Sequence, residues 1–183
     1  MTVSLKDYIN SISDGETRDA LAIVLGAIQT ELTAIHGDSI INATTLSVGS
    51  TAENVATTAF QFRIDGVTVA KAAVAAGTAL TAATINVGTA TGDYWGGFAL
   101  QITSAGVISS KAAAADQVLT TEGAARVAAM EITADAGNVI IGWFTVEANT
   151  DSAWTAGTDD LTAASDCQAV NFYSAPSSLT LTA

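Results

Sequence analysis

The chain has 183 residues, 49% of them hydrophobic and only 13% charged, so it is long enough to bury a core and too apolar for a disordered chain. Six basic and eighteen acidic residues give a net charge of −12, and the basic residues lie far apart in the sequence. Nucleic acids and anionic membranes are bound by clustered Lys and Arg. We therefore expect neither a nucleic-acid nor a membrane partner.

Residues 1–36 form the first predicted segment, a helical one in two parts. The first part carries apolar residues at i, i+3, i+4 and i+7, namely Leu5, Tyr8, Ile9 and Ile12. We interpret these as an anchor that grips a partner surface; the alternative is that they lengthen a helical bundle. Residues 13–16 then have the Ser-x-x-Glu form of a capping box, which predicts the start of a second helix.

The second helix carries an apolar stripe with spacings of four, three, four and three, the pattern of a heptad seam. Its members are Leu21, Leu25, Ile28, Leu32 and Ile35. An isolated helix of this length is marginal in water, so the stripe needs a partner. We predict self-association, as a homotrimer because Ile23 and Val24 widen the apolar face. The alternative is an amphipathic helix packed on its own domain.

Residues 37–58 are small and polar, and we interpret them as a connector with one short strand at 45–48. From residue 59 to residue 183 the pattern indicates a β-rich domain, because apolar residues now alternate with polar ones. The predicted strands are residues 60–64, 67–69, 98–102, 107–109, 139–146 and 169–173.

Turn signals join these strands into hairpins. Asp65-Gly66 between alternating segments is a strong hairpin signal, and Ser104-Ala105-Gly106 predicts a second turn. Residues 139–146 are apolar on both faces, which predicts the central and most buried strand. The Ala-rich residues 121–130 predict one short helix. The predicted fold is mainly β, an antiparallel β-sandwich-like C-terminal domain after an N-terminal α-helical oligomerisation segment.

Residues suited to catalysis are scarce. The chain has one histidine, His36, and one cysteine, Cys167, which excludes an internal disulfide. A nucleophilic triad would need His36 to reach the β domain from the end of the oligomerising helix. Zinc needs three or four ligands, and no phosphate-binding glycine loop is present. We expect no enzyme activity, no catalytic residue, no cofactor and no metal.

Two binding alternatives stay open in the sequence. Calcium prefers oxygen ligands, and four aspartates occur in one Gly/Thr/Ser-rich stretch, although without EF-hand spacing: Asp151, Asp159, Asp160 and Asp166. Trp95 and Trp154, with the Gly-rich loops, could contact a host surface glycan. A distant third alternative is a glycan hydrolase, in which Asp93 would act in a groove lined by Trp95, Trp143 and Trp154. Tryptophans in such a chain are more often core residues, and loop aspartates are more often turn formers.

A combination of segments resembles a group of small tailed-bacteriophage virion proteins. The segments are residues 99–102, 105–109, 135–146 and 154–162. The combined pattern is similar to "aGNv-iGy-tV", then "WtaGTddLt", closing on a "v-fy" strand, and the resemblance covers about residues 60–173. It implies a head-decoration, head-fibre or tail-associated protein, and it carries over no catalytic residues.

The resemblance implies a virion location and a phage capsid or tail protein as partner. The first residues lack the basic region and apolar run of a secretory signal, and the apolar run at 20–28 is too short to span a bilayer. We expect synthesis in the cytosol, which suits a particle released by lysis. The favoured function is a homotrimeric capsid decoration or head-fibre protein; the alternative is a tail-associated receptor-binding adhesin that recognises a host surface glycan.

Overall fold

The computed structural model describes residues 37–86 and 94–177, together with a few residues of the N-terminal segment. Those few are Gly15, Thr17, Asp19, Leu21 and residues 23–25, all of them helical. The chain divides into two compact units, Met1–Gly37 and Asp38–Ala183. We call the second one the β unit, because its described residues form mainly strands, arranged in four sheets.

The largest sheet has four antiparallel strands in the order β13-β11-β8-β9. Their bounds are Trp95–Thr103 (β8), Ile108–Ala112 (β9), Asn138–Ala148 (β11) and Cys167–Ser174 (β13). β11 pairs with β8 on one side and with β13 on the other. Its central place confirms the prediction from its apolar sequence.

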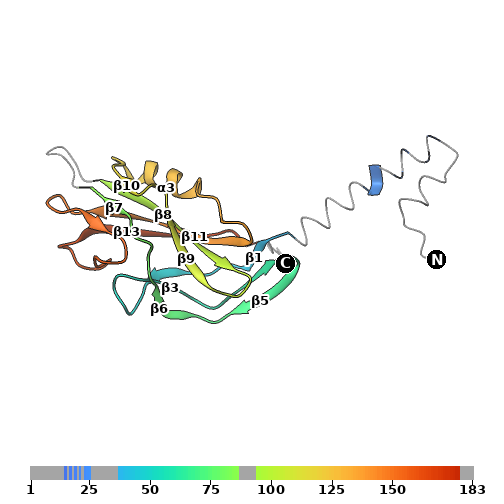
Figure 1. Cartoon of the computed structure of the whole chain (residues 1–183), viewed down its shortest axis with the longest axis horizontal. Coiled ribbons are helices and arrows are strands. Elements are labelled where there is room, and N and C mark those ends of the chain that lie inside the picture. Colours follow the sequence, from blue (N-terminus) through green and yellow to red (C-terminus); the bar gives the residue numbers. More distant parts are fainter. Residues whose placement is uncertain are drawn as a thin grey trace, which may run out of the picture. The chain divides into compact units, whose positions relative to one another are not determined.

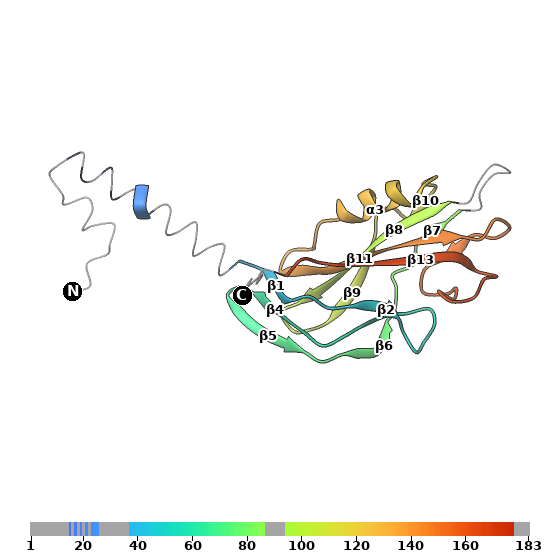
Figure 2. The same ribbon diagram turned by 180° about the vertical axis from the view of Figure 1, so that it is seen from behind.

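Two three-stranded antiparallel sheets lie along one face of this sheet (Figures 1 and 2). The first has the order β1-β4-β5, with β1 at Ser39–Asn42, β4 at Phe60–Ile64 and β5 at Val67–Lys71. The second has the order β2-β3-β6, with β2 at Leu46–Val48, β3 at Val55–Thr57 and β6 at Val74–Thr78. Sheets packed face to face are compatible with a β-sandwich-like fold.

A fourth, small sheet has the order β10-β7-β12. Its strands are Thr84–Ile85 (β7), Asp116–Gln117 (β10) and Trp154–Thr155 (β12). β10 and β7 are parallel, whereas β12 and β7 are antiparallel. Gln117, Ile85 and Trp154 stand in one row across this sheet, and all three side chains are buried.

The main core lies between the facing sheets. β4 contributes every second side chain to it, Phe60, Phe62 and Ile64, while Gln61 is exposed. The opposite sheet contributes the buried residues Phe98, Leu100, Ile102, Ile141, Phe144 and Val146. Burying one such large side chain stabilises the fold by roughly 1.5–3 kcal/mol, so these few residues carry much of the stability of an Ala-rich chain.

Helix α3 (Glu122–Met130) covers the other face of the four-stranded sheet, over β8 and β11 (Figure 1). Thr121 caps the helix, because its side chain accepts a hydrogen bond from the amide of Ala124. Ala125 and Ala129 are its buried residues, and Gly97 of β8 lies directly beneath them. Small residues on both sides allow the helix to lie close to the sheet.

Both predicted hairpins are confirmed. β4 and β5 pair from Ile64–Val67 outward across a two-residue turn, in which Asp65 has φ 51° and Gly66 has φ 77°. Two left-handed residues are what a type I′ turn requires. β8 and β9 are joined through Gly106, which has φ 79°. The strand predicted at 169–173 is confirmed within β13, and the helix predicted at 121–130 is confirmed as α3.

Two features differ from the expectation. The most continuously buried strand is β8 rather than β11, because the core covers one of its faces and α3 covers the other. Residues 37–58, expected as a connector with one short strand at 45–48, carry β1, β2 and β3 and belong from Asp38 onward to the β unit. Of these strands, β2 confirms the expected one. Most residues of this segment are small, and its few large buried residues are Ile40, Leu46 and Val55. The resulting alternation is too weak to predict three strands from the sequence.

Candidate functional surfaces

The structure describes two of the five residues of the predicted oligomerisation stripe, Leu21 and Leu25. Both are helical and half-buried. Beside them, Ile23 is 74% exposed and Val24 is 53% exposed. Large apolar side chains exposed together on a helix are candidates for a contact surface.

The other predicted contact residues lie outside the described residues. These are Ile28, Leu32 and Ile35 of the stripe, and Leu5, Tyr8, Ile9 and Ile12 of the anchor. His36 and Asp93 also lie outside the described residues.

The Cys167 thiol is buried in the core and is held at the start of β13. Burial, together with the nearby carboxylates of Asp160 and Asp166, raises the pKa of Cys167 from its ordinary value of 9.0 to about 11. A nucleophilic cysteine needs a lowered pKa and access to solvent. The environment of Cys167 is the opposite of this and suits a core residue.

The aspartates considered for calcium hold their own loop together. Asp160 Oδ1 accepts hydrogen bonds from the hydroxyl and the amide of Thr162 and from the amide of Ala163, which lowers the pKa of Asp160. Asp159 accepts from the amide of Thr155, and Asp166 accepts from the amide of Asp160. Within the described part of the chain, no three Asp, Glu, His or Cys side chains group as a metal site would.

The three tryptophans have different surroundings. Trp154 is fully buried, and its ring meets Phe98 edge-on at a centroid distance of 5.6 Å. It therefore cannot stack on a glycan, which corrects its expected role in an adhesin. Trp143 and Trp95 are half-buried and lie on the same side of the sheet as α3, as their register shows.

A polar cluster joins the start of α3 to the edge strand β13. The Tyr173 hydroxyl donates to a carboxylate oxygen of Glu122, and the Arg126 guanidinium lies 5.8 Å from the centre of the Tyr173 ring. Burial raises the pKa of Tyr173, and the neighbouring Glu122 carboxylate adds to the effect. These contacts fix the helix on the sheet.

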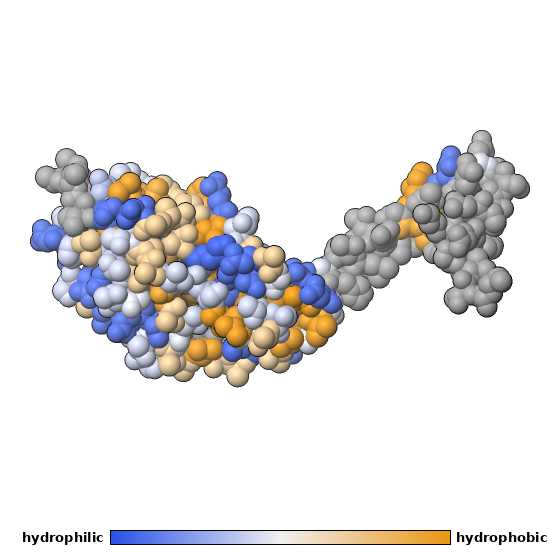
Figure 3. Space-filling model, in the orientation of Figure 1, coloured by the Kyte–Doolittle hydropathy of each residue, from blue (hydrophilic) through white to orange (hydrophobic). Residues whose placement is uncertain are grey.

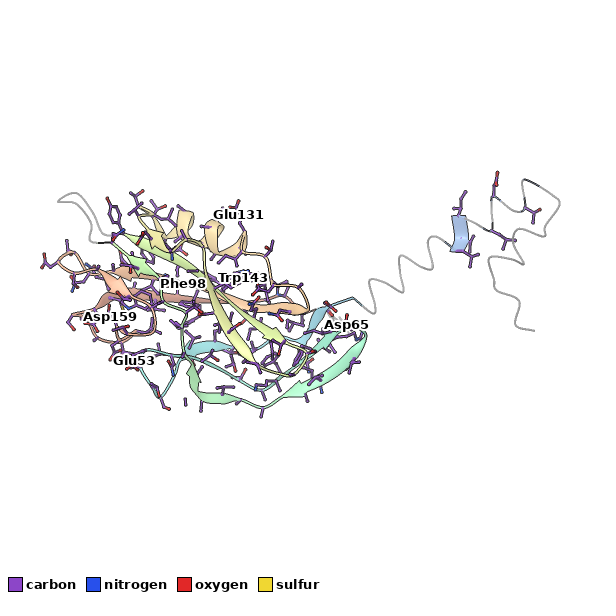
Figure 4. All side chains as sticks on the ribbon, viewed as in Figure 1. Glu53, Asp65, Phe98, Glu131, Trp143 and Asp159 are labelled. Carbon is purple, nitrogen blue, oxygen red and sulfur yellow. The ribbon has the colours of Figure 1, made fainter. Side chains whose placement is uncertain are left out.

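A second polar cluster fixes the chain just after α3. Asp135 accepts hydrogen bonds from Lys111 Nζ at 2.7 Å and from Gln101 Nε2 at 2.5 Å, while its amide donates to Gln101 Oε1 at 2.8 Å. The bond from Lys111, followed by the bond from Gln101, lowers the pKa of Asp135. Figure 4 labels Glu131, the residue after α3, and Trp143 of β11.

Sequence reasoning missed one further surface, at the end of the β unit where the chain enters it. The amide of Asp65 donates to Asp38 Oδ1 at 2.8 Å, so the first residue of the unit is tied to the β4–β5 turn. The next residue after the turn, Val67, is 62% exposed. Periodicity could not find it, because an alternating strand predicts which side chains share a face and not whether that face is covered.

No protein-family model, no curated protein and no solved structure matches the chain. Among the residues that the structure describes, no helix combines the length and the hydropathy needed to cross a membrane.

Proposed function

We propose that this chain is a non-enzymatic structural protein of a bacteriophage virion, a homotrimeric capsid decoration or head-fibre protein attached through its N-terminal segment. In this proposal residues 21–35 join three copies, Leu5, Tyr8, Ile9 and Ile12 grip the phage shell, and the β unit is displayed outward. The phage assignment follows the resemblance of residues 60–173 to small tailed-phage virion proteins.

The observation that carries the assembly part is the apolar exposure of the N-terminal helix. Ile23 and Val24 extend into solvent beside the half-buried Leu21 and Leu25. Covering such side chains contributes roughly 1.5–3 kcal/mol each when burial is complete. Sister copies carry the same stripe, and an apolar face broader than a two-stranded seam favours three helices.

The surroundings of the chemically reactive side chains support a structural role. Cys167 is buried and has a raised pKa, and the carboxylates of Asp160 and Asp166 accept hydrogen bonds from backbone amides of their own loop. The adhesin alternative is weaker than the decoration or fibre role, because the burial of Trp154 removes one of the two tryptophans on which glycan recognition depended.

Attachment is tested by binding the full chain to expanded empty capsids of the phage that encodes it. Saturable binding is expected, and deletion of residues 1–13 should abolish it. Ile9→Asp places a charge on the anchor spacing and should weaken binding, whereas Ser11→Asp places the same charge off that spacing and should not. Unaltered binding by the deletion variant would refute the anchor, and binding to host glycans instead of capsids would favour the adhesin.

A further inference from the structure

Helix α3 is held on the sheet by few large apolar contacts. Its buried residues are Ala125 and Ala129, whereas its two largest apolar side chains face outward, Val127 being 55% and Met130 54% exposed. Figure 3 shows hydrophobic atoms at the surface in the region of α3. An isolated helix of nine residues is marginal in water, so α3 depends on its contacts with the sheet. Two buried alanines bury far less apolar area than the phenylalanines and isoleucines of the main core.

The sheet face beneath α3 carries a buried polar group that the helix does not satisfy. Trp143 of β11 stands opposite Ala99 of β8, on the face that α3 covers. The indole N–H of Trp143 is buried and has no hydrogen-bond partner among the described residues. A buried donor without a partner has lost its bond to water on folding, which disfavours the covered arrangement. Movement of α3 away from the sheet would return water to this group.

The chain is fixed on both sides of α3. Before the helix, the amide of Trp95 donates to the carbonyl oxygen of Leu119 at 2.7 Å. After the helix, Lys111 Nζ donates to the carbonyl oxygen of Thr133 at 2.9 Å. A segment between two such fixed points can open locally while the rest of the domain stays folded. The segment that can do so here is residues 120–132.

One polar contact connects the first turn of α3 to the edge strand β13. The Tyr173 hydroxyl donates to a carboxylate oxygen of Glu122, and Arg126, one turn further along α3, lies over the Tyr173 ring. Tyr173 stands opposite Trp143 in the sheet, so it reaches α3 from beside the covered face. Hydrogen bonds to a charged group are stronger than neutral ones. The Tyr173–Glu122 hydrogen bond, which we call the latch, is therefore a main contact between α3 and the sheet.

We propose that residues 120–132 form a detachable cover of the four-stranded sheet, which opens as a unit while the strands stay paired. The latch keeps this cover closed. Opening exposes the α3 side of β8 and β11, including Gly97, Ala99 and Trp143. The proposal concerns the β unit alone, and it does not depend on the proposed homotrimer.

Hydrogen exchange of the full chain tests the cover, followed residue by residue by NMR at a pH where exchange reports the opening equilibrium. We expect the α3 amides to be at least about 100-fold less protected than the paired amides of β8 and β11. Two buried indole N–H groups give a matched comparison, since neither has a partner within the described part of the chain. That of Trp143 should exchange with α3, whereas that of Trp154, in the main core, should exchange with the sheet. Equal protection of α3 and the sheet would overturn the cover.

Two variants separate local opening from unfolding of the whole unit. Ile64→Val weakens the main core, so it should speed exchange of the sheet amides about two- to tenfold and leave the α3 amides unchanged. Equal acceleration of both sets would mean that α3 opens only when the unit unfolds, and would overturn the proposal. Tyr173→Phe removes the latch and should speed exchange of the α3 amides about tenfold. Tyr94→Phe, at a tyrosine packed against the main core, should leave them unchanged, and unchanged α3 exchange in Tyr173→Phe would overturn the latch.

Discussion

Gly97 of β8 lies so close to the backbone of α3 that a side chain on it would collide with the carbonyl oxygen of Ala125. The amide of Gly97 is also used, since it donates to Gln117 Oε1 at 2.7 Å. Gly97 therefore sets the distance between the helix and the sheet.

The first prediction follows from this contact. Gly97→Ala should lower the free energy of unfolding by about 1–3 kcal/mol, because the helix backbone must move to admit the methyl group. Gly123→Ala is the control, since Gly123 lies in α3 with open space around the position of a Cβ. It should raise stability by up to about 1 kcal/mol through helix propensity. Urea denaturation of both variants measures the difference, and equal effects would contradict the close approach.

The second prediction concerns Asp135 and pH. The lowered pKa of Asp135 means that its charged form is favoured in the folded state. Its contribution to stability is therefore present above pH 3.8 and is lost as the pH falls through the folded-state pKa. Asp135→Asn should therefore lower the thermal midpoint at about pH 6 and have a much smaller effect at about pH 2. The exposed Asp116, changed to Asn, is the matched control. A deficit that is the same at both pH values would contradict the assignment.

The third prediction concerns Cys167. With a pKa of about 11, only about a thousandth of the thiol is ionised at about pH 8. Ellman's reagent should react at least about 100-fold more slowly with the native chain than with the chain in concentrated urea, because burial adds to the low thiolate fraction. Rapid reaction of the native chain would show that the thiol is accessible.

The same group gives a stability change at alkaline pH. Because folding raises the pKa of Cys167, its neutral form is favoured in the folded state. The contribution of this thiol to stability is therefore complete below pH 9.0 and is lost as the pH rises toward about 11. Cys167→Ala should be less sensitive over that interval. The raised pKa of Tyr173 acts in the same direction, so the variant keeps part of the sensitivity.

Elements with local signals were predictable from sequence. The Asp65-Gly66 turn fixes both positive φ values by residue type, and the alternation of Phe60, Phe62 and Ile64 fixes the buried face of β4. The Ala-rich α3 follows from helix propensity and from its cap at Thr121. Each of these features is decided by residues close together in sequence.

Elements decided by distant partners were not predictable. β7, β10 and β12 have two residues each and exist because they pair with one another across long sequence separations. Trp154 looked like a glycan contact because sequence alone does not reveal that it stands beside Ile85, against Phe98. The burial of both faces of β8 likewise depends on the packing of α3 against the sheet, which the sequence does not show.

The same distinction between local and long-range features applies outside the regular elements. The heptad stripe is a local pattern and was predicted from the sequence, whereas the hydrogen bond between Asp65 and Asp38 joins residues 27 positions apart and could not be predicted. Local periodicity thus indicated the helix that we propose joins the copies.

The most direct test of self-association through residues 21–35 is sedimentation equilibrium of the full chain. We predict a mass three times the 18.4 kDa of one chain. Leu25→Asp with Ile28→Asp should reduce this to one chain, while Thr30→Asp, at the heptad position facing away from the seam, should leave the trimer intact. A wild-type chain that sediments with the mass of a single copy at every concentration would contradict self-association through residues 21–35.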